Sequence, residues 1–345
     1  MTVGRATPAW AEPGAFPAAP GIHRIPLPMP TDGLVAVNVY AVEDGERLVL
    51  IDGGWAVPEA RARLDRALAA LDADVRAVSR ILVTHAHRDH YTLAVQLRRE
   101  VGTPIGLGAG ERPALLALTE QWQGSLRAQR DVLRAAGAEP LLRELEALGG
   151  SQGPPDGYEP PDEWLEPGCI ELAERSLEVV ATPGHTQGHV VFRDADAGVL
   201  FAGDHVLPHI TPSIGFEPVP MVSPLRDFLA SLDALRRLPD TLLLPAHGGP
   251  APSVHGRIDE LVAHHDARLA EMRAAVGGLG GATAFEVAAA LGWTRRQRRF
   301  AELDVFNRML AVTETVAHLT VLVDSGALVR SGDEPVRYAP APAGR

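Results

Sequence analysis

Lysine is absent from this chain, and asparagine and cysteine are nearly so. All 32 basic residues are arginine, asparagine occurs only at Asn38 and Asn307, and Cys169 is the single cysteine. One cysteine excludes an intrachain disulfide and a cluster of thiolate metal ligands. The abundance of Ala, Gly and Pro that accompanies these gaps is typical of genomic compositional bias, so we infer no function from it.

Long apolar runs and a basic charge excess are also missing. No apolar run approaches the ~18 residues of a membrane span. The first twenty residues lack the basic start and apolar core of a signal peptide. The formal net charge of −12 disfavours nucleic acid as a partner, although a local basic patch is compatible with it. These features predict a cytoplasmic protein that has no membrane partner.

The length of 345 residues predicts two domains, and a hydrophobic content of 46% allows a sizeable core. Short apolar runs alternate with helical periodicity along most of the chain, which indicates α/β layering. The pattern changes near residue 276. We expect a flexible leader over residues 1–20, a main domain over 21–275 with a helical insertion over 111–168, and a small C-terminal domain over 276–345.

The densest group of metal-ligand residue types is the stretch Thr84-His85-Ala86-His87-Arg88-Asp89-His90. It follows the apolar run 79–83, which predicts a buried strand. Because side chains alternate along a strand, His85 and His87 should point the same way at its end. Asp89 and His90 open the next segment, which we expect to be a helix. Imidazoles and a carboxylate suit Zn²⁺ or another first-row divalent ion, so the stretch predicts a metal site.

Three later strands are predicted to end in a similar manner. Each closes with a His or Asp beside Gly or Pro: His185 in T-P-G-H-T-Q-G-H, Asp204 in G-D-H, and His247 in P-A-H-G-G. An earlier strand ends in Asp52, which leaves one more carboxylate at a strand tip. Ligands on loops held by a rigid sheet commonly assemble binding sites. The four motifs therefore predict one site built from distant parts of the chain.

With these motifs the chain resembles the metallo-β-lactamase superfamily, and it is most similar to the glyoxalase II-like hydrolases over residues 20–275. The resemblance implies an α/β fold, an αββα sandwich with two divalent metal ions. Zinc is expected, and manganese and iron accept the same ligands. One ion would be held by His85, His87 and His185, the other by Asp89, His90 and His247, with Asp204 bridging. The family also places Asp52 and His189 close to the site as supports.

The chemistry of individual positions separates the family branches. His87 stands where the flavodiiron branch carries a glutamate, which favours hydrolysis over dioxygen chemistry. Asp204 stands where true β-lactamases usually have a cysteine or lack the bridging acid, which disfavours antibiotic hydrolysis. The sulfur dioxygenases, which bind one iron, share the motif set and stay an alternative.

The resemblance implies a metal-activated water that attacks the substrate, because two cations ~3.5–4 Å apart lower the pKa of a shared water towards ~7. Asp89 is the expected catalytic residue, a terminal ligand that orients the nucleophile and moves its proton. The expected substrate is a small ester or thioester, acyl-CoA types included. The alternatives are an endoribonuclease or phosphodiesterase of the same superfamily, and a non-enzymatic metal sensor. His205 and His209 could contact substrate, but each alone is more typical of a structural residue.

The insertion breaks the α/β order. Residues 111–150 predict two or three helices, and the proline-rich residues 151–168 predict an extended loop. Lying between two groups of ligands, the insertion is suited to cover the site. It is equally suited to pack outside, or to form a contact in a homo-oligomer, and the sequence leaves these alternatives open.

The C-terminal residues predict a helix over 283–291 capped by Thr283, a longer helix over 303–324, and a small hairpin from 325–329 and 336–338. This order resembles a winged-helix domain, a module that follows the catalytic domain in endoribonuclease-like and thioesterase-like relatives. The dense basic cluster consists of Arg295, Arg296, Arg298 and Arg299. It suits phosphate binding, but the overall acidity favours a solvated surface stretch.

Overall fold

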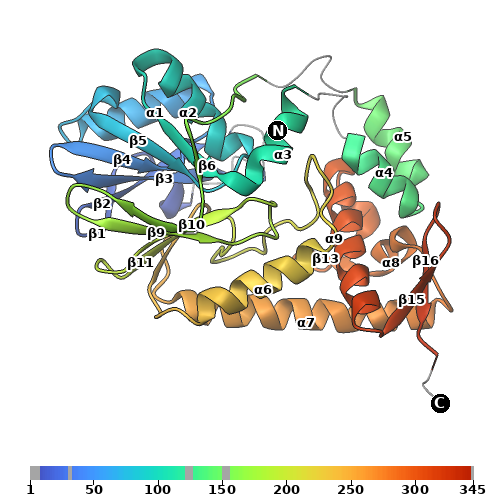
Figure 1. Cartoon of the computed structure of the whole chain (residues 1–345). Coiled ribbons are helices and arrows are strands. Elements are labelled where there is room, and N and C mark those ends of the chain that lie inside the picture. Colours follow the sequence, from blue (N-terminus) through green and yellow to red (C-terminus); the bar gives the residue numbers. More distant parts are fainter. Residues whose placement is uncertain (1–7, 30–32, 121–126, 150–155, 343–345) are drawn as a thin grey trace.

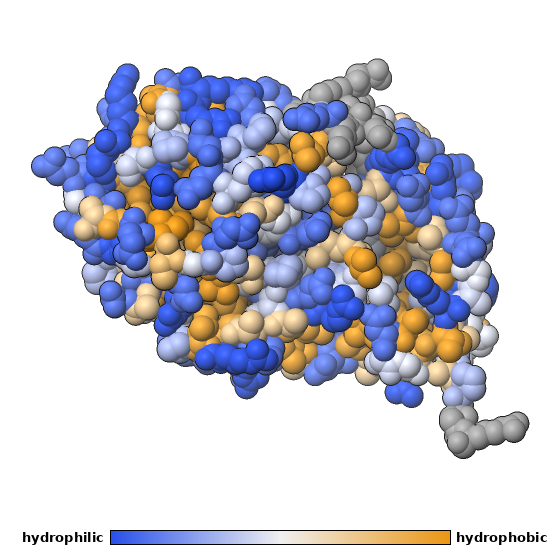
Figure 2. All heavy atoms as spheres, in the orientation of Figure 1, coloured by the Kyte–Doolittle hydropathy of each residue, from blue (hydrophilic) through white to orange (hydrophobic). Residues whose placement is uncertain are grey.

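Two β-sheets packed face to face form the centre of the protein (Figure 1). The computed structural model describes residues 8–29, 33–120, 127–149 and 156–342. Helices cover the outer face of each sheet, which gives the expected α/β/β/α layering (Figure 1). Figure 2 shows hydrophobic patches over the sheets and along the lower helices, separated by hydrophilic residues.

The first sheet has seven strands in chain order. They are β1 (Phe16–Ala19), β2 (Ile22–Pro28), β3 (Ala36–Asp44), β4 (Arg47–Ile51), β5 (Val78–Val83), β6 (Ile105–Gly108) and β7 (Glu163–Leu165). Strands β1 to β4 pair antiparallel, and β4 to β7 pair parallel. The parallel crossovers carry the helices α1 (Pro58–Ala69) and α2 (Arg88–Val101), which cover this sheet. The connections also contain 3-10 turns at Val75–Ala77 and Ala109–Glu111.

The second sheet has five strands in the order β12-β11-β10-β9-β8. They are β8 (Gly168–Glu171), β9 (Ser176–Ala181), β10 (Val190–Asp194), β11 (Val199–Gly203) and β12 (Leu242–Pro245). All neighbours are antiparallel except β11 and β12, which pair parallel. The helices α6 (Pro224–Arg236) and α7 (Val254–Gly278) cover its outer face.

Apolar side chains fill each of the three spaces between these layers. One cluster packs α1 and α2 on the first sheet, a second lies between the sheets, and a third packs α6 and α7 on the second sheet. Between the sheets, Tyr40 and Phe201 meet edge to face at 5.3 Å, and the Tyr40 hydroxyl donates to the Pro245 carbonyl at 2.8 Å. This ring contact and this hydrogen bond connect the two sheets near the ends of their strands.

The sheets contain three short strands that the sequence analysis did not predict. Within the expected leader, residues 1–7 lie outside the described residues, but a 3-10 turn at Ala9–Ala11 and the strand β1 follow them. Arg24 of β2 stacks on Phe16, with its guanidinium 5.1 Å from the ring centroid, and donates to the Trp10 carbonyl. Strands β7 and β8 occupy part of the region expected as loop. All three are three or four residues long, too short for a clear alternating pattern.

The C-terminal unit contains the predicted elements in the predicted order, with a further short hairpin between the two helices. They are α8 (Ala284–Ala290), a two-stranded hairpin of β13 (Gly292–Trp293) and β14 (Arg298–Arg299), a 3-10 turn at Phe300–Glu302, α9 (Val305–Asp324), and a hairpin of β15 (Leu328–Ser331) and β16 (Arg337–Pro340). Thr283 caps α8 in a reciprocal capping box with Glu286. The four arginines of the basic cluster lie exposed in the β13–β14 hairpin, where Arg299 pairs with Glu302 at 2.9 Å.

Two of the three helices of the insertion pack against the C-terminal unit. The three helices are α3 (Arg112–Leu118), α4 (Arg127–Ala135) and α5 (Glu139–Ala147). Helices α4 and α5 share one apolar cluster with the C-terminal unit, in which Leu133 and Leu141 lie with Met309. Arg308 of α9 also donates to Glu144 of α5 at 2.6 Å. None of the described helices is long and apolar enough to cross a membrane.

Helices α7 and α9 meet at a fully buried histidine pair. The Nδ1 atom of His265 lies 3.1 Å from the Nε2 atom of His318. The Nδ1–H of His318 donates to the Glu314 carbonyl at 2.8 Å. Burial lowers the pKa of His265 to about 3 and that of His318 to about 4. Both imidazoles are therefore neutral in the folded protein and would take up protons more readily once the chain unfolds.

This pair predicts a loss of stability in mild acid. Each folded pKa lies below the ~6.5 of an unfolded histidine, so the stabilisation is complete above pH ~6.5 and decreases as the pH falls towards the folded values. His265→Gln should reduce the loss in unfolding free energy between pH 7 and 5 by about 1–2 kcal/mol. Chemical denaturation at both pH values measures this. His209→Gln at the surface is the control, and an equal reduction in both variants would contradict the prediction.

Candidate metal centre

The topology brings the predicted strand ends to one edge of the two sheets. Strands β4 and β5 are parallel, so the residues after them lie together, and the same holds for β11 and β12. Strand β9 runs in the same direction as β11, because each is antiparallel to β10. A hydrogen bond of 2.9 Å from the Val190 amide to the Thr84 carbonyl joins the two sheets at this edge.

The local structure places the four candidate ligands of the 84–90 stretch at this edge. His85 is the second residue after β5, and His87 is the N-cap residue of α2. Asp89 and His90 therefore lie in the first turn of that helix. The structure thus brings the first four expected ligands together, from the end of one strand and the beginning of one helix.

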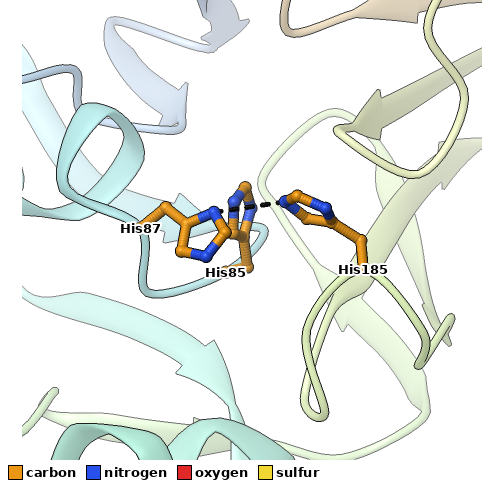
Figure 3. Close-up of side chains that lie close together, drawn as sticks. All are labelled: His85, His87 and His185. Carbon is orange, nitrogen blue, oxygen red and sulfur yellow. Dashed lines mark hydrogen bonds between the residues drawn. The ribbon is translucent and has the colours of Figure 1, made fainter. Parts of the chain in front are cut away.

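The first group of ligand atoms belongs to His85, His87 and His185, and these atoms all lie within 4.8 Å of one another. Figure 3 shows the three imidazoles converging, with His185 approaching from the opposite loop. The Nδ1 atom of His87 lies 3.1 Å from the Nε2 atom of His185. Nitrogen atoms that surround one zinc ion at ~2 Å are separated by about this distance.

The second group consists of Asp89, His90 and His247, again within 4.8 Å of one another. The Oδ2 atom of Asp89 lies 3.5 Å from His90 Nε2 and 3.4 Å from His247 Nε2. Asp204 lies between the two groups. Its Oδ1 atom is 3.3 Å from His247 Nε2, and its Oδ2 atom is 3.6 Å from His185 Nε2. One oxygen of Asp204 therefore faces each group, as a bridging ligand requires.

Several donor atoms in this centre are buried without a hydrogen-bond partner in the described parts of the chain. These atoms are His85 Nε2, His90 Nε2, His247 Nε2 and Asp204 Oδ1. A buried polar atom without a partner costs ~1–3 kcal/mol, so one such atom at a site is unusual and four together require an explanation. A pair of cations satisfies all four, and the residues present fit a divalent metal centre.

The opposite ring nitrogen of four of these imidazoles is anchored by the protein. The bonds are His85 Nδ1 to Thr84 Oγ1 at 3.1 Å, His90 Nδ1 to Asp52 Oδ2 at 2.9 Å, His185 Nδ1 to the Ser213 carbonyl at 2.8 Å, and His247 Nδ1 to the Ala36 carbonyl at 2.8 Å. A donor at Nδ1 leaves the Nε2 lone pair directed at the centre. The anchoring thus selects the tautomer that binds a metal ion.

Burial and the neighbouring charges set the protonation of the ligands. Burial lowers the pKa of His185 to about 4, which keeps that imidazole neutral. Burial alone would raise the pKa of Asp204, but His247 and His90 lower it well below its usual range. Burial likewise opposes ionisation of Asp89, yet His90 and His247 lower its pKa to about 2. Burial opposes protonation of His90 and His247 as well, but the neighbouring carboxylates raise the pKa of His90 to about 9 and that of His247 well above its usual value. A cation that binds here would displace these two protons, because only the neutral imidazole is a ligand.

Asp52 and His189 contact the ligands rather than the common centre. Asp52 accepts hydrogen bonds from the Thr84 amide at 2.8 Å and from His90 Nδ1 at 2.9 Å. The Nε2 atom of His189 accepts from the Asp204 amide at 3.2 Å, and its Nδ1 atom lies 2.8 Å from Thr182 Oγ1. Both residues therefore fix the orientation of a ligand side chain or its backbone.

The two further histidines of the Asp204 loop have different surroundings. His205 is buried and packs on the ring of Phe228 with a centroid separation of 4.8 Å. His209 is exposed, and a Cβ atom on Gly248 would lie 3.7 Å from its Cδ2 atom. His209 thus lies at the rim beside the His247 loop, while His205 belongs to the packing under it.

Two buried glutamates beside the ligands were not found by sequence analysis. Glu111 accepts from the Thr186 hydroxyl and from the Gly188 amide at 3.2 Å, and Glu217 Oε1 lies 3.7 Å from His87 Nε2. Burial raises the pKa of Glu111 to about 7 and that of Glu217 to about 8. Neither residue lies in a motif or at a recognisable spacing, so the sequence carried no signal for them.

The layered fold and the His/Asp centre define a metal-binding domain of the α/β type. The family model of the Metallo-beta-lactamase superfamily matches residues 32–247, and the chain belongs to this superfamily. Most members of the superfamily are metal-dependent hydrolases. The chain therefore combines a superfamily domain with a candidate metal-binding cluster.

Two solved structures resemble nearly the whole chain. A metallo-beta-lactamase family protein from Thermus thermophilus is 31% identical with a TM-score of 0.75, covering 93% of this chain and 99% of that one. A beta-lactamase domain protein from Burkholderia ambifaria is 28% identical with a TM-score of 0.78, covering 97% and 96%. Because these matches cover nearly the whole chain, they extend beyond the superfamily domain into the C-terminal unit.

Curated relatives are more distant. The probable metallo-hydrolase YqjP of Bacillus subtilis (strain 168) is 26% identical over 310 residues, which cover 87% of this chain and 90% of the relative. The lactamase-like protein nscB of Aspergillus fumigatus is 27% identical over 237 residues, 68% of this chain. The chain spans only 55% of the length of that fungal protein.

Proposed function

We propose that this chain is a cytoplasmic, dinuclear metal hydrolase of the glyoxalase II-like branch that cleaves a small ester or thioester. The observation that carries the proposal is the convergence of seven ligand side chains on one centre, with buried donor atoms lacking protein partners among the described residues. His85, His87 and His185 would hold one ion, and Asp89, His90 and His247 the other, with Asp204 shared. Zinc suits this ligand set best, and manganese or iron could replace it.

When bound, two divalent ions supply Lewis-acid polarisation of a carbonyl group and an activated water at neutral pH. Asp89 is the residue best placed to orient that water and to move its proton, because it belongs to only one of the two ligand groups. Asp204 is less suited to this task, since each of its oxygens faces a different group. The anchored imidazoles keep the centre rigid, so little reorganisation accompanies the reaction.

Arg88, which precedes Asp89 in the first turn of α2, favours a substrate with an anionic portion. Arg88 stacks over Trp55, with its guanidinium 5.1 Å from the ring centroid. An arginine held over an aromatic ring is suited to bind a carboxylate or a phosphate. This supports an acyl-CoA-type thioester within the proposed substrate class.

The C-terminal unit supports a second candidate, an endoribonuclease or phosphodiesterase. We interpret its two helices and hairpin as winged-helix-like, and the β13–β14 hairpin exposes the arginine cluster. Phosphate contacts of this kind weaken steeply with salt. An RNA gel shift at low and high salt therefore separates the candidates, because the absence of a shift at low salt removes the nuclease.

Metal analysis combined with an activity panel tests the proposal. The purified protein should contain about two metal ions per chain and hydrolyse a member of a thioester, ester and lactone panel. A chelator should abolish this hydrolysis, and zinc, manganese or iron should restore it, because the proposed nucleophile is a water activated by the bound ions. Undiminished hydrolysis by protein shown to be free of metal would overturn the proposal.

A further inference from the structure

A short segment, residues 213–217, connects the metal centre to the C-terminal unit. At one end, the Ser213 carbonyl accepts the Nδ1–H of His185 at 2.8 Å. At the other end, Glu217 is buried and its Oε1 atom lies 3.7 Å from His87 Nε2. The segment therefore contacts two of the three ligands in the first group, and it contacts each on the side away from the centre.

His87 differs from the other imidazoles in how it is held. It directs Nδ1 to the centre, where that atom lies 3.1 Å from His185 Nε2, so its Nε2–H is the outward donor. Among the described residues, Glu217 is the acidic side chain with an oxygen within 4.0 Å of this nitrogen. The other Glu217 oxygen accepts from the Gln187 amide at 3.4 Å, in the loop that carries His185. Glu217 thus joins the loops of both ligands.

Helix α9 of the C-terminal unit holds this segment from behind. Phe216 packs edge-on against Phe306 at 5.5 Å, and Ile214 lies buried in the cluster that contains Ala317. Gly215 adopts a positive φ of 88°, and a Cβ atom there would lie 3.2 Å from the Thr313 carbonyl oxygen. The segment therefore has little freedom to move away from α9.

The insertion holds the same segment from a second side. Gln129 of α4 is buried, and its Nε2–H donates to the Glu217 carbonyl at 2.8 Å. Helix α4 in turn packs in the apolar cluster of the C-terminal unit. The backbone of Glu217 is thus fixed by an element whose own position depends on that unit.

We infer that the C-terminal unit completes the metal centre: α9 fixes segment 213–217, and Glu217 is a positioning residue that orients His87 through its Nε2 atom. The inference rests on the proposed metal site. An acceptor oxygen behind a ligating histidine fixes the orientation of the ring, and removing such a partner costs ~10–100-fold in metal affinity. The C-terminal unit would then contribute to metal binding without contributing a ligand.

The test is a zinc titration of the full chain against a competing chelator, with Glu217→Ala and Glu217→Gln beside the wild type. Glu217→Ala should weaken one of the two bound ions by ~10–100-fold and leave the other unchanged. Glu217→Gln keeps an acceptor of similar size and should recover part of the loss. A purely structural Glu217 would instead lower the unfolding free energy of the metal-free protein and leave the ratio of the two affinities unchanged.

Two further variants separate the contribution of α9 from general damage. Phe306→Ala removes the ring that packs on Phe216 and should weaken the same ion, since it loosens the segment without touching a ligand. Glu314→Gln is the matched control: Glu314 is a carboxylate of α9 whose pKa burial raises to about 7, outside the metal centre. It should leave both affinities unchanged.

The outcomes are distinguishable. Wild-type protein that binds no zinc overturns the proposed function itself. Wild-type protein that binds two ions, with Glu217→Ala binding both at unchanged affinity, overturns only the positioning role. Loss of one ion in Glu217→Ala but not in Phe306→Ala keeps the role of Glu217 and removes that of α9.

Discussion

Asp204→Ala is expected to abolish metal-dependent hydrolysis. The two oxygens of Asp204 face different ligand groups, at 3.3 Å from His247 and 3.6 Å from His185, so one substitution removes a ligand from both. Removal of a residue that only hydrogen-bonds to a metal ligand costs ~10–100-fold in metal affinity or activity. Removal of a ligand shared by two ions should therefore lower the activity by more than ~100-fold. The metal content should fall from about two ions per chain to one or none. Elemental analysis and rate measurements on the purified variant check both.

The matched control for this variant is Asp194→Ala. Asp194 is also a buried carboxylate of the second sheet, but it pairs with Arg175 at 2.9 Å and lies outside the ligand groups. Its loss should lower the unfolding free energy, because it leaves a largely buried arginine unpaired, while the metal content stays at the wild-type value. An Asp204→Ala protein that keeps two ions and full activity would contradict the bridging role.

Gly188→Ala should destabilise the protein strongly although Gly188 is not a candidate ligand. A Cβ atom at this position would lie 2.0 Å from the Glu111 amide nitrogen and 2.2 Å from the Gly110 carbonyl carbon. Both are backbone atoms, so the whole 108–111 segment or the whole 185–189 loop must move. We expect a loss of about 3 kcal/mol or more in unfolding free energy, together with weaker metal binding. Chemical denaturation and zinc titration measure the two effects.

Gly277→Ala provides the comparison. This glycine lies near the end of α7, and a Cβ atom there would meet nothing within 4 Å. Alanine favours the helix over glycine, so this variant should be neutral or slightly more stable. If Gly188→Ala matched Gly277→Ala in stability and in metal binding, the close approach of the two backbones would have no energetic role.

The residues of the candidate metal centre could be predicted from the sequence because their signals are local. His85, His87, Asp89 and His90 occupy one stretch, and each later ligand follows an apolar strand and lies beside Gly or Pro. Because β4 pairs parallel with β5, and β11 with β12, the residues that follow these strands lie at one edge of the sheets. The alternation of strands and helices likewise predicted the layers of the main domain.

Glu111 and Glu217 could not be predicted in this way. The contacts that define them reach Thr186 and His87, which are distant in the chain, and a single glutamate outside any motif has no distinguishing pattern. The same limit applies to the insertion. Its periodicity predicted helices, but the apolar faces of α4 and α5 gave no indication that their partner would be the C-terminal unit rather than the sheets.

The apolar cluster that α4 and α5 share with α8 and α9 joins two stretches separated by more than a hundred residues of sequence. Grafting the insertion alone onto a related scaffold would expose the apolar side chains of Leu133, Leu141 and Leu142 to water. Recombination between members of this superfamily would therefore conserve solubility only when the insertion and the tail are inherited together.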